Sequence, residues 1–473
     1  MIGRPSLIRS LAKSAVTGGR RIVRFSLLLG MGVAWTVRAG AGAELELPAV
    51  PASGTESRQF AVTNFGAVGD GQMLCTKAIQ RGIDTIAAQG GGTLCLTPGT
   101  FLTGALFLKP GVNLHLEANA VLKGSPELKD YPELVTRIEG LQQPLVAALI
   151  NASRCPNLRL TGSGTIDGNG KPFWVAFWQA ITRNPKTTNV EVKRPRLIFL
   201  EHCPGAHLEG LKLVDAGFWN VHVYDCHQLV IDGLDISAPN QGLRNGPEIA
   251  GQRWQDLGAV RAPSSDGIDV DSCQHVIIRN CTIGVDDDNI ALKGSKGPFA
   301  LADQASLPVD DVLVENCTFR YGHGALTFGS EATVVRNVVM RHCQVLGGHT
   351  ILRLKLRPDT PQTYEHVLVE YITANPSGRL IAAAPWNSTA DLQGQPQPPS
   401  LIRDITIRGV HGHAREFGLL SNHATSHIQD IRLEAIDIQS DQPEFRGGAG
   451  LANVTFTNVL VNAQPPQVEI GGK

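Results

Sequence analysis

Six aspartates lie between Ser264 and Pro298, in the stretch SSDGIDVDSCQHVIIRNCTIGVDDDNIALKGSKGP. Three of them are consecutive, at 286–288, and the strand-like run HVIIRNCTI separates them from Asp266. Carboxylates held close together repel one another, so at least one keeps its proton at a pH where another is ionised. An acid that protonates a leaving oxygen, beside a base that activates water, is what a glycosidase needs.

A histidine and two cations follow the aspartates along the chain. The sequence GHG contains His323, and RLK contains Arg353 and Lys355. Residues two apart on a strand point to the same side. Taken singly, three aspartates are typical of a solvated turn or a calcium site, GHG of a tight turn, and RLK of an alternating strand. Their order and spacing favour one shared face.

A sequence repeat indicates the fold that positions these residues. From about residue 146, short alternating strands and Asn/Gly/Asp turns recur, as in AHLEGLKLVDA (206–216) and HVIIRNCTIG (275–284), and the clearest step runs from Cys203 to Cys226. Strands at this period without alternating helices exclude a βαβ design. We predict an all-β, right-handed parallel β-helix, with a β-sandwich or a propeller as the alternative. Stacked rungs would then place Asp266 and Asp287 on neighbouring turns.

The chain organisation is predicted as a signal peptide at 1–43 and one β-helix domain at 44–473. The signal is indicated by arginines, an apolar run at 25–37 that is too short to span a membrane, and AGA at 41–43. It predicts a secreted or periplasmic protein with no membrane association after cleavage. Residues 74–90 have helical spacing and are expected to cap the solenoid.

Composition restricts the partners and cofactors. The formal net charge of -1 gives no global signal for nucleic acid or membranes, so the expected partner is a polysaccharide or oligosaccharide and the expected state a monomer. Nine cysteines occur without any CxxC pair, which argues against structural zinc. We expect no metal and no cofactor, and we expect the cysteines to stack as small buried residues.

The chain resembles glycoside hydrolase family 28, the pectin-degrading polygalacturonase family, and its bacterial type in particular. That family carries Asn-Thr-Asp, Gly-Asp-Asp, Gly-His-Gly and Arg-Ile-Lys in this order. The matching segments here are Ser264-Ser265-Asp266, Asp286-Asp287-Asp288, Gly322-His323-Gly324 and Arg353-Leu354-Lys355. Similar segments such as VTNFGAVGDG (62–71) and GSGTIDGNG (162–170) extend the resemblance over almost the whole chain after residue 44.

The resemblance implies a role for each matched residue. Asp287 would be the general acid, and Asp266 and Asp288 would hold and deprotonate water in a single-displacement, inverting hydrolysis. His323 would tune the acid. The cations that bind the sugar carboxylate would be Arg353 and Lys355, with Lys293, Lys296 and Arg357 extending the basic patch; Trp386 is the expected sugar contact, whereas Trp219 suits either the core or a sugar.

Departures from the family pattern leave alternatives open. Two serines replace Asn-Thr, and Asp286 replaces a glycine. Asp269 and Asp271 lie outside the motifs and are interpreted as turn or backbone-bonding groups. The stretch 289–304 is longer than in compact family members and would wall off one end of the cleft, which slightly favours exo action.

Several other functions remain as alternatives to a polygalacturonase. They are a rhamnogalacturonan-directed hydrolase, a pectate lyase-like enzyme that uses calcium, and a non-catalytic carbohydrate-binding β-helix. For the stereochemistry we follow the inversion that the resemblance implies, since three acids can diverge to hold a water, although one general rule points the other way. By the general rule, closely spaced carboxylates favour retention rather than the family's inversion.

Overall fold

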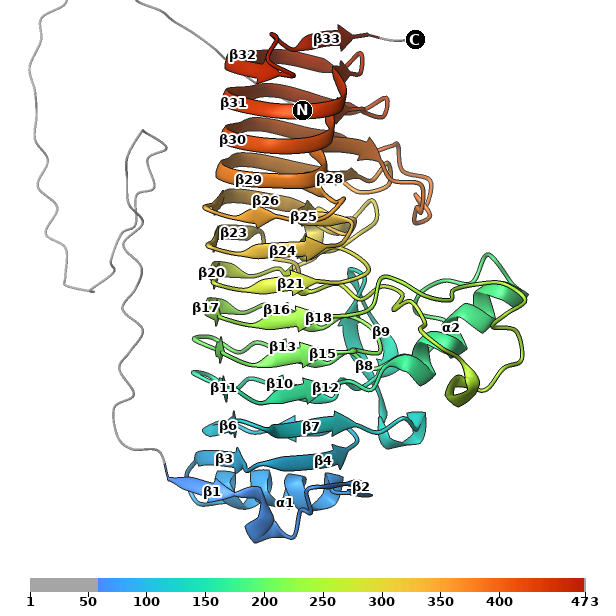
Figure 1. Cartoon of the computed structure of the whole chain (residues 1–473), viewed down its shortest axis with the longest axis vertical. Helices are drawn as coiled ribbons and strands as arrows, with labels where there is room; N and C mark the ends of the chain where they lie inside the picture. The colour runs from blue at the N-terminus through green and yellow to red at the C-terminus, as the bar shows by residue number, and fades with distance from the viewer. Residues whose placement is uncertain (1–57, 472–473) are drawn as a thin grey trace, which may run out of the picture. The chain divides into compact units, whose positions relative to one another are not determined.

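The computed structural model describes residues 58–471, so the predicted signal peptide lies outside the described residues. Within the unit Pro51–Lys473, the described strands other than one antiparallel hairpin pair in parallel from rung to rung along one axis (Figure 1). Consecutive parallel strands in such a coil are joined by right-handed connections. The predicted all-β, right-handed parallel β-helix is therefore confirmed.

The strands form three columns, of which the first carries the aspartates. We call this first column the site sheet. It contains β5 (Leu106–Leu108), β10 (Ile150–Ser153), β13 (Ile198–Glu201), β16 (Val221–Tyr224), β19 (Ile268–Asp271), β22 (Ile290–Lys293), β25 (Gly324–Phe328) and β28 (Thr350–Leu356).

The other two columns close each rung. The second contains β1 (Gln59–Ala61), β3 (Gly92–Leu96), β6 (Val112–Leu116), β11 (Arg159–Gly162), β14 (His207–Glu209), β17 (His227–Asp232), β20 (Gln274–Arg279), β23 (Val309–Glu315) and β26 (Val334–Arg341). The third contains β2 (Asp70–Leu74), β4 (Gly99–Thr103), β7 (Ala120–Gly124), β12 (Thr165–Asp167), β15 (Lys212–Val214), β18 (Asp235–Ser237), β21 (Thr282–Gly284), β24 (Thr318–Tyr321) and β27 (Gln344–Val345). The last rungs are β29 (Gln362–Pro385), β30 (Ser400–Leu420), β31 (Ser426–Gly447), β32 (Leu451–Val461) and β33 (Gln467–Ile470).

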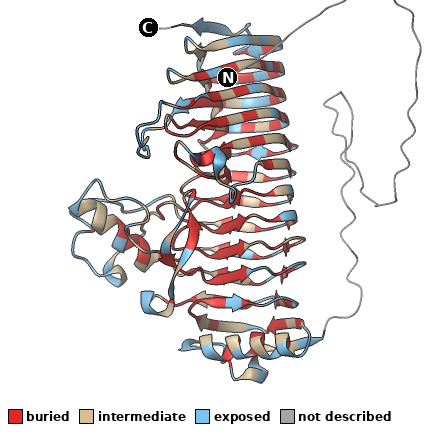
Figure 2. Cartoon of the chain, turned by 180° about the vertical axis from the view of Figure 1, so that it is seen from behind, coloured by how far each residue is buried: buried red, intermediate tan, exposed pale blue. Residues whose placement is uncertain are grey.

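Inward-facing side chains stack in rows to form the core. One row runs through Leu114, Leu160, Leu208 and Ile231, which are register partners on successive rungs and are all buried. Buried residues alternate along strands such as β6 and β7, whereas β16, β19, β22 and β25 of the site sheet are buried throughout, and Figure 2 shows buried residues concentrated along the coil. All nine cysteines are buried and none forms a disulfide, as expected for small residues packed in register.

The corners between strands use residues that tolerate positive φ. The segment HVIIRNCTI breaks at Asn280, where φ is 55°, and becomes β20 and β21. Asparagine accepts this left-handed conformation more readily than most side chains do. The recurring asparagines of the sequence repeat therefore mark corners of the coil.

Four inserted segments depart from the regular coil. Helix α1 (Thr76–Ala88) buries Ile79, Ile83 and Ile86 at the N-terminal end of the stack (Figure 1); its role as a cap stays a prediction. Helix α2 (Lys171–Arg183), which sequence reasoning missed, projects from the stack. The antiparallel hairpin of β8 (Glu133–Ile138) and β9 (Leu141–Val146) runs alongside the stack. The fourth segment is the loop 294–308, which contains a short 3-10 turn.

None of the helices among residues 58–471 has both the length and the apolar character needed to cross a membrane.

Candidate active site

The site sheet brings the three predicted acids together at the corner before β19 and β22. Asp266, Asp287 and Asp288 each offer a carboxylate oxygen within 4.8 Å of the others. Asp266 and Asp288 are buried and Asp287 is half-buried. Three carboxylates in one small volume cannot all ionise without compensating charge, so the surrounding cations and protons decide their states.

The register corrects one detail of the predicted stacking. Ile268 of β19 pairs with Ile290 of β22, so Asp266 is level with Asp288 rather than with Asp287. One turn of the coil at this point is one residue longer than the separation of Asp266 and Asp287. These two residues are therefore on neighbouring turns but are not level with each other.

The register also shows how Arg353 reaches the acids. Arg353 of β28 is level with Thr327 of β25, whereas the residue level with His323 is His349. Arg353 therefore lies further along its strand than the histidine does. Its long side chain spans the remaining distance to Asp288.

His323 lies beside the predicted acid, as expected. Its Nδ1 is 3.1 Å from Oδ1 of Asp287. The Asp287 carboxylate raises the pKa of the His323 imidazole above its usual value of 6.5. Burial would raise the pKa of Asp287, but His323, Lys355 and Arg353 outweigh it and hold that pKa below the usual range. The pair therefore holds its one proton on the His323 imidazole, with Asp287 ionised beside it.

The RLK spacing predicted two cations on the face of the acids, and the structure pairs both of them with Asp288; their binding of a sugar carboxylate stays a prediction. Nζ of Lys355 is 2.5 Å from Oδ2, and Nη1 of Arg353 is 3.1 Å from Oδ1, which also accepts a hydrogen bond from the Thr327 hydroxyl at 2.9 Å. Burial opposes ionisation, but Lys355 and Arg353 lower the pKa of Asp288. The Lys355 ammonium also lies 4.7 Å from the ring centre of Trp386, which places the predicted sugar contact at the same site.

Lys293 sits on the side of the acids toward the N-terminus. Its Nζ is 3.2 Å from Oδ2 of Asp266, 3.3 Å from Oδ1 of Asp269, and 4.5 Å from the ring centre of Trp219. Burial raises the pKa of the Asp266 carboxyl to about 7, and Lys293 limits the rise. In the free protein Asp266 therefore holds a proton more readily than Asp287 does. The family roles imply the opposite, because they make Asp287 the acid and Asp266 one of the two groups that deprotonate water.

The interpretation of Asp269 and Asp271 as turn residues is wrong. Both lie in β19 and are buried. Asp271 forms a bidentate ion pair with the equally buried Arg137 of β8, with distances of 2.9 and 3.2 Å. This pair anchors the hairpin to the site sheet.

Two further side chains near the acids were not predicted from the sequence. His349 is level with His323 on the next rung and is buried, with neither ring nitrogen hydrogen-bonded; burial lowers its pKa to about 4. Glu331 lies within 4.0 Å of Lys293 and 3.5 Å of Arg357. No motif marks either residue, because their relevance comes only from the register.

The departures from the family motif have specific partners. Asp286, in the glycine position, pairs with Arg261 at 2.5 Å. Ser264 has a φ of 52°, and its hydroxyl bonds Oδ1 of Asn189, a residue of the segment that follows α2, at 2.9 Å. An amide from a distant segment therefore stands beside the serine that replaces the motif asparagine.

Inserted segments wall the N-terminal side of the acids. The turn of the β8–β9 hairpin, Glu139-Gly140, packs against Gly294 and Glu331, since an added Cβ at Gly140 would lie 2.9 Å from the Gly294 carbonyl oxygen. Lys296 of the loop 294–308 lies 3.7 Å from Glu139. Residues 290–293 of the predicted wall at 289–304 form β22, and the loop that follows packs against the hairpin turn; that these segments close one end of a cleft stays a prediction.

The predicted basic patch is only partly open. Lys296 is occupied by Glu139, and Arg357 is buried and paired with Asp359 at 2.6 Å. The three aspartates could geometrically hold a cation, but lysine and arginine already contact Asp288 and Asp266. The expectation of no metal stays a prediction.

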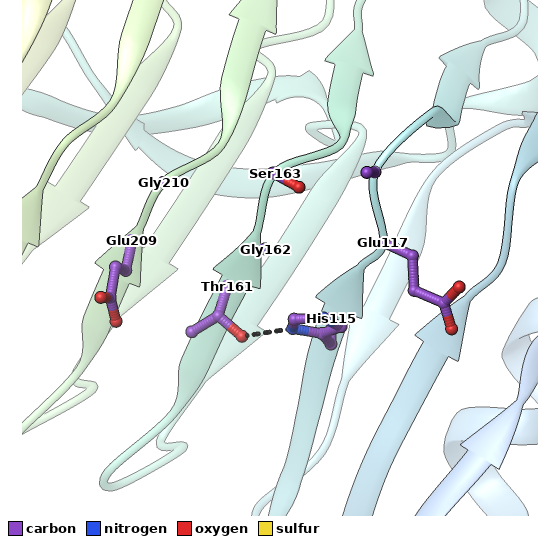
Figure 3. Close-up of a pocket in the computed structure, with 8 residues that line it drawn as sticks. His115, Glu117, Thr161, Gly162, Ser163, Glu209 and Gly210 are labelled. Carbon is purple, nitrogen blue, oxygen red and sulfur yellow. Dashed lines mark hydrogen bonds between the residues drawn. The ribbon is translucent and has the colours of Figure 1, made fainter.

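A depression of about 610 Å³ lies elsewhere on the coil (Figure 3). It is lined by residues of β6, β11 and β14 and the turns that follow them, and His115 bonds the Thr161 hydroxyl at 2.9 Å there. None of these strands carries a predicted site residue.

Comparison with known proteins identifies the family. The model of glycosyl hydrolases family 28 matches residues 108–458. The chain belongs to this family. A probable polygalacturonase of Vitis vinifera is 28% identical over 61% of this chain and 55% of its own length. An exo-poly-alpha-D-galacturonosidase of Dickeya chrysanthemi is 26% identical over 57% of this chain and 47% of its own length.

A solved structure supports the same fold. A hyperthermoactive exopolygalacturonase from Thermotoga maritima superposes with a TM-score of 0.65 at 22% identity, covering 86% of this chain and 92% of its own. The family 28 chain described here spans about half the length of the two curated relatives above.

Proposed function

We propose that this family 28 chain hydrolyses α-galacturonosyl linkages of pectin from a chain end. The observation that carries the proposal is the group of three aspartates with a histidine on Asp287 and two cations on Asp288. An anionic sugar needs fixed cations beside the acids, and Arg353 and Lys355 supply them. The names of the relatives from Dickeya and Thermotoga support exo action.

The protonation states of the acids support a single displacement. Asp288 stays ionised because Lys355 and Arg353 stabilise its charge, so it can accept a proton from water while Asp266 orients that water. The proton held by the His323–Asp287 pair passes through Asp287 to the leaving oxygen. The water's O–H bond breaks toward Asp288 as its oxygen bonds the anomeric carbon, and the departing sugar leaves with the proton from Asp287.

The wall on the N-terminal side supports exo action. The β8–β9 hairpin is held along the site sheet by Arg137, and its turn closes against Glu331. A polymer entering from the C-terminal side would stop at this wall. Product sizing over time separates the possibilities, because short products from the start support exo action, whereas a ladder of random oligomers contradicts it.

The test of the function compares two substrates side by side. Polygalacturonate hydrolysis that exceeds rhamnogalacturonan hydrolysis by orders of magnitude supports the proposal, and the reverse preference supports the rhamnogalacturonan alternative. Asp287→Asn is the matched control. It is expected to abolish turnover while leaving substrate binding in place. A wild-type protein that binds but never cleaves would instead support a non-catalytic β-helix.

A further inference from the structure

The turn of the β8–β9 hairpin holds a glutamate in a backbone conformation that disfavours it. Glu139 and Gly140 have φ of 47° and 75°, so both central residues of this two-residue turn are left-handed. Hairpin turns of this kind favour Asn, Asp or Gly at the first position. A residue in this conformation costs energy and persists only where its surroundings hold it.

Charged neighbours surround the Glu139 carboxylate on the side of the catalytic acids. It is half-buried, with a side-chain exposure of 18%, and lies 3.7 Å from the Lys296 ammonium. Arg137 donates a hydrogen bond to the Gly140 carbonyl at 3.2 Å and fixes the turn. Glu331 packs against the turn and lies within 4.0 Å of Lys293, which in turn contacts Asp266. The turn is therefore connected to Asp266 through Glu331 and Lys293, a chain of three contacts.

The orientation of the substrate follows from the acid and the water. Asp287 bonds His323, which precedes β25, whereas Asp266 precedes β19, two rungs nearer the N-terminus. The leaving sugar then lies toward the C-terminal rungs, and the sugar attacked by water lies toward the hairpin. In an exo enzyme with this arrangement the hairpin faces the non-reducing end.

We propose that Glu139, while paired with Lys296, accepts a hydrogen bond from the free C4 hydroxyl of the non-reducing terminal galacturonate. Internal units of the polymer have no free C4 hydroxyl, because the linkage occupies that oxygen. A carboxylate at the closed end therefore selects chain ends. This inference rests on the proposed function and identifies the C4 hydroxyl as the substrate group that the site recognises.

The probe is a pair of oligogalacturonates of equal length. One has a saturated non-reducing end, and the other is produced by elimination, so its terminal ring carries a C4–C5 double bond and no C4 hydroxyl. The wild-type protein is expected to prefer the saturated oligomer in kcat/KM by about tenfold to a hundredfold, the range for a hydrogen bond to a charged group. Equal kcat/KM values for the two would overturn the proposal.

The variant is Glu139→Gly, which removes the carboxylate and suits the backbone, since glycine adopts positive φ freely. Its preference for the saturated oligomer should fall to about onefold. Ala463→Gly, at another left-handed position with φ of 60°, is the matched control and should keep the wild-type preference. An unchanged preference in the Glu139 variant contradicts the assignment. If the wild-type protein cleaves neither oligomer, the proposed function itself fails.

Discussion

His323→Gln is the perturbation that most sharply tests where the acid proton is held. In the structure the acid proton belongs to the His323–Asp287 pair, joined at 3.1 Å, and Asp287 raises the pKa of the imidazole above 6.5. The pair therefore keeps its proton at pH 6. Glutamine retains a polar side chain of similar reach but has no titrating proton to share.

The expected loss follows from the aspartate that remains. Without the histidine, the only proton left for the acid is the carboxyl proton of Asp287, and an ordinary aspartyl carboxyl has a pKa of 3.8. At pH 6 such a group is protonated in roughly one molecule in 150. We expect kcat/KM at pH 6 to fall on the order of a hundredfold. In the profile of kcat/KM against pH, the apparent pKa of the alkaline limb should move from above 6.5 toward the pKa of an ordinary aspartate.

The assay is the release of reducing ends from polygalacturonate, measured as kcat/KM across pH. His366→Gln is the control, because His366 makes a similar 2.7 Å contact with Asp404 at similar exposure but outside the site. An unchanged alkaline limb in the His323 variant would refute the role of His323 in holding the proton. Equal losses in both variants would show a general effect of removing histidine.

Three further outcomes follow from the same contacts. Lys355→Met should raise the pKa of Asp288, because it removes the ammonium that lowers that pKa, and should move the acid limb of the pH profile of kcat/KM to higher pH, together with a higher KM; a fixed acid limb contradicts the role of Lys355. Arg137→Met should lower the free energy of unfolding by about 3–5 kcal/mol, because it leaves the buried Asp271 carboxylate unpaired; denaturant titration measures this, and a loss below about 1 kcal/mol argues against the anchor. A chelator should leave activity unchanged, whereas loss restored by calcium supports the lyase alternative.

The periodic features of the fold were readable from the sequence. Asparagine and cysteine recur at corners, and alternating apolar residues mark each strand, so rungs and columns followed from local pattern. The acids and their cations followed from motif order. The number of residues in one particular turn could not be predicted, because an additional residue at a corner leaves the pattern of the strands unchanged. For this reason the sequence places Asp266 level with Asp287, whereas in the structure it is level with Asp288.

Contacts made across the stack could not be predicted in the same way. The role of Asp271 depends on its ion pair with Arg137, which lies far away in the sequence. Arg137 belongs to an antiparallel hairpin that does not follow the sequence repeat. Helix α2 lies in an insertion and joins the stack through Trp174, whose indole nitrogen donates to the Ala216 carbonyl at 2.8 Å. Such partners depend on how inserted segments fold back, and one strand's pattern does not contain that information.

The most direct test of the account is the anomeric configuration of the first product, followed by proton NMR during cleavage of polygalacturonate. The carboxylate oxygens lie within 4.8 Å of one another, which the general spacing rule associates with retention. The account instead assigns Asp288 and Asp266 to a water, and predicts that galacturonate appears first as the β anomer. Initial release of the α anomer, or of an unsaturated sugar, would contradict it.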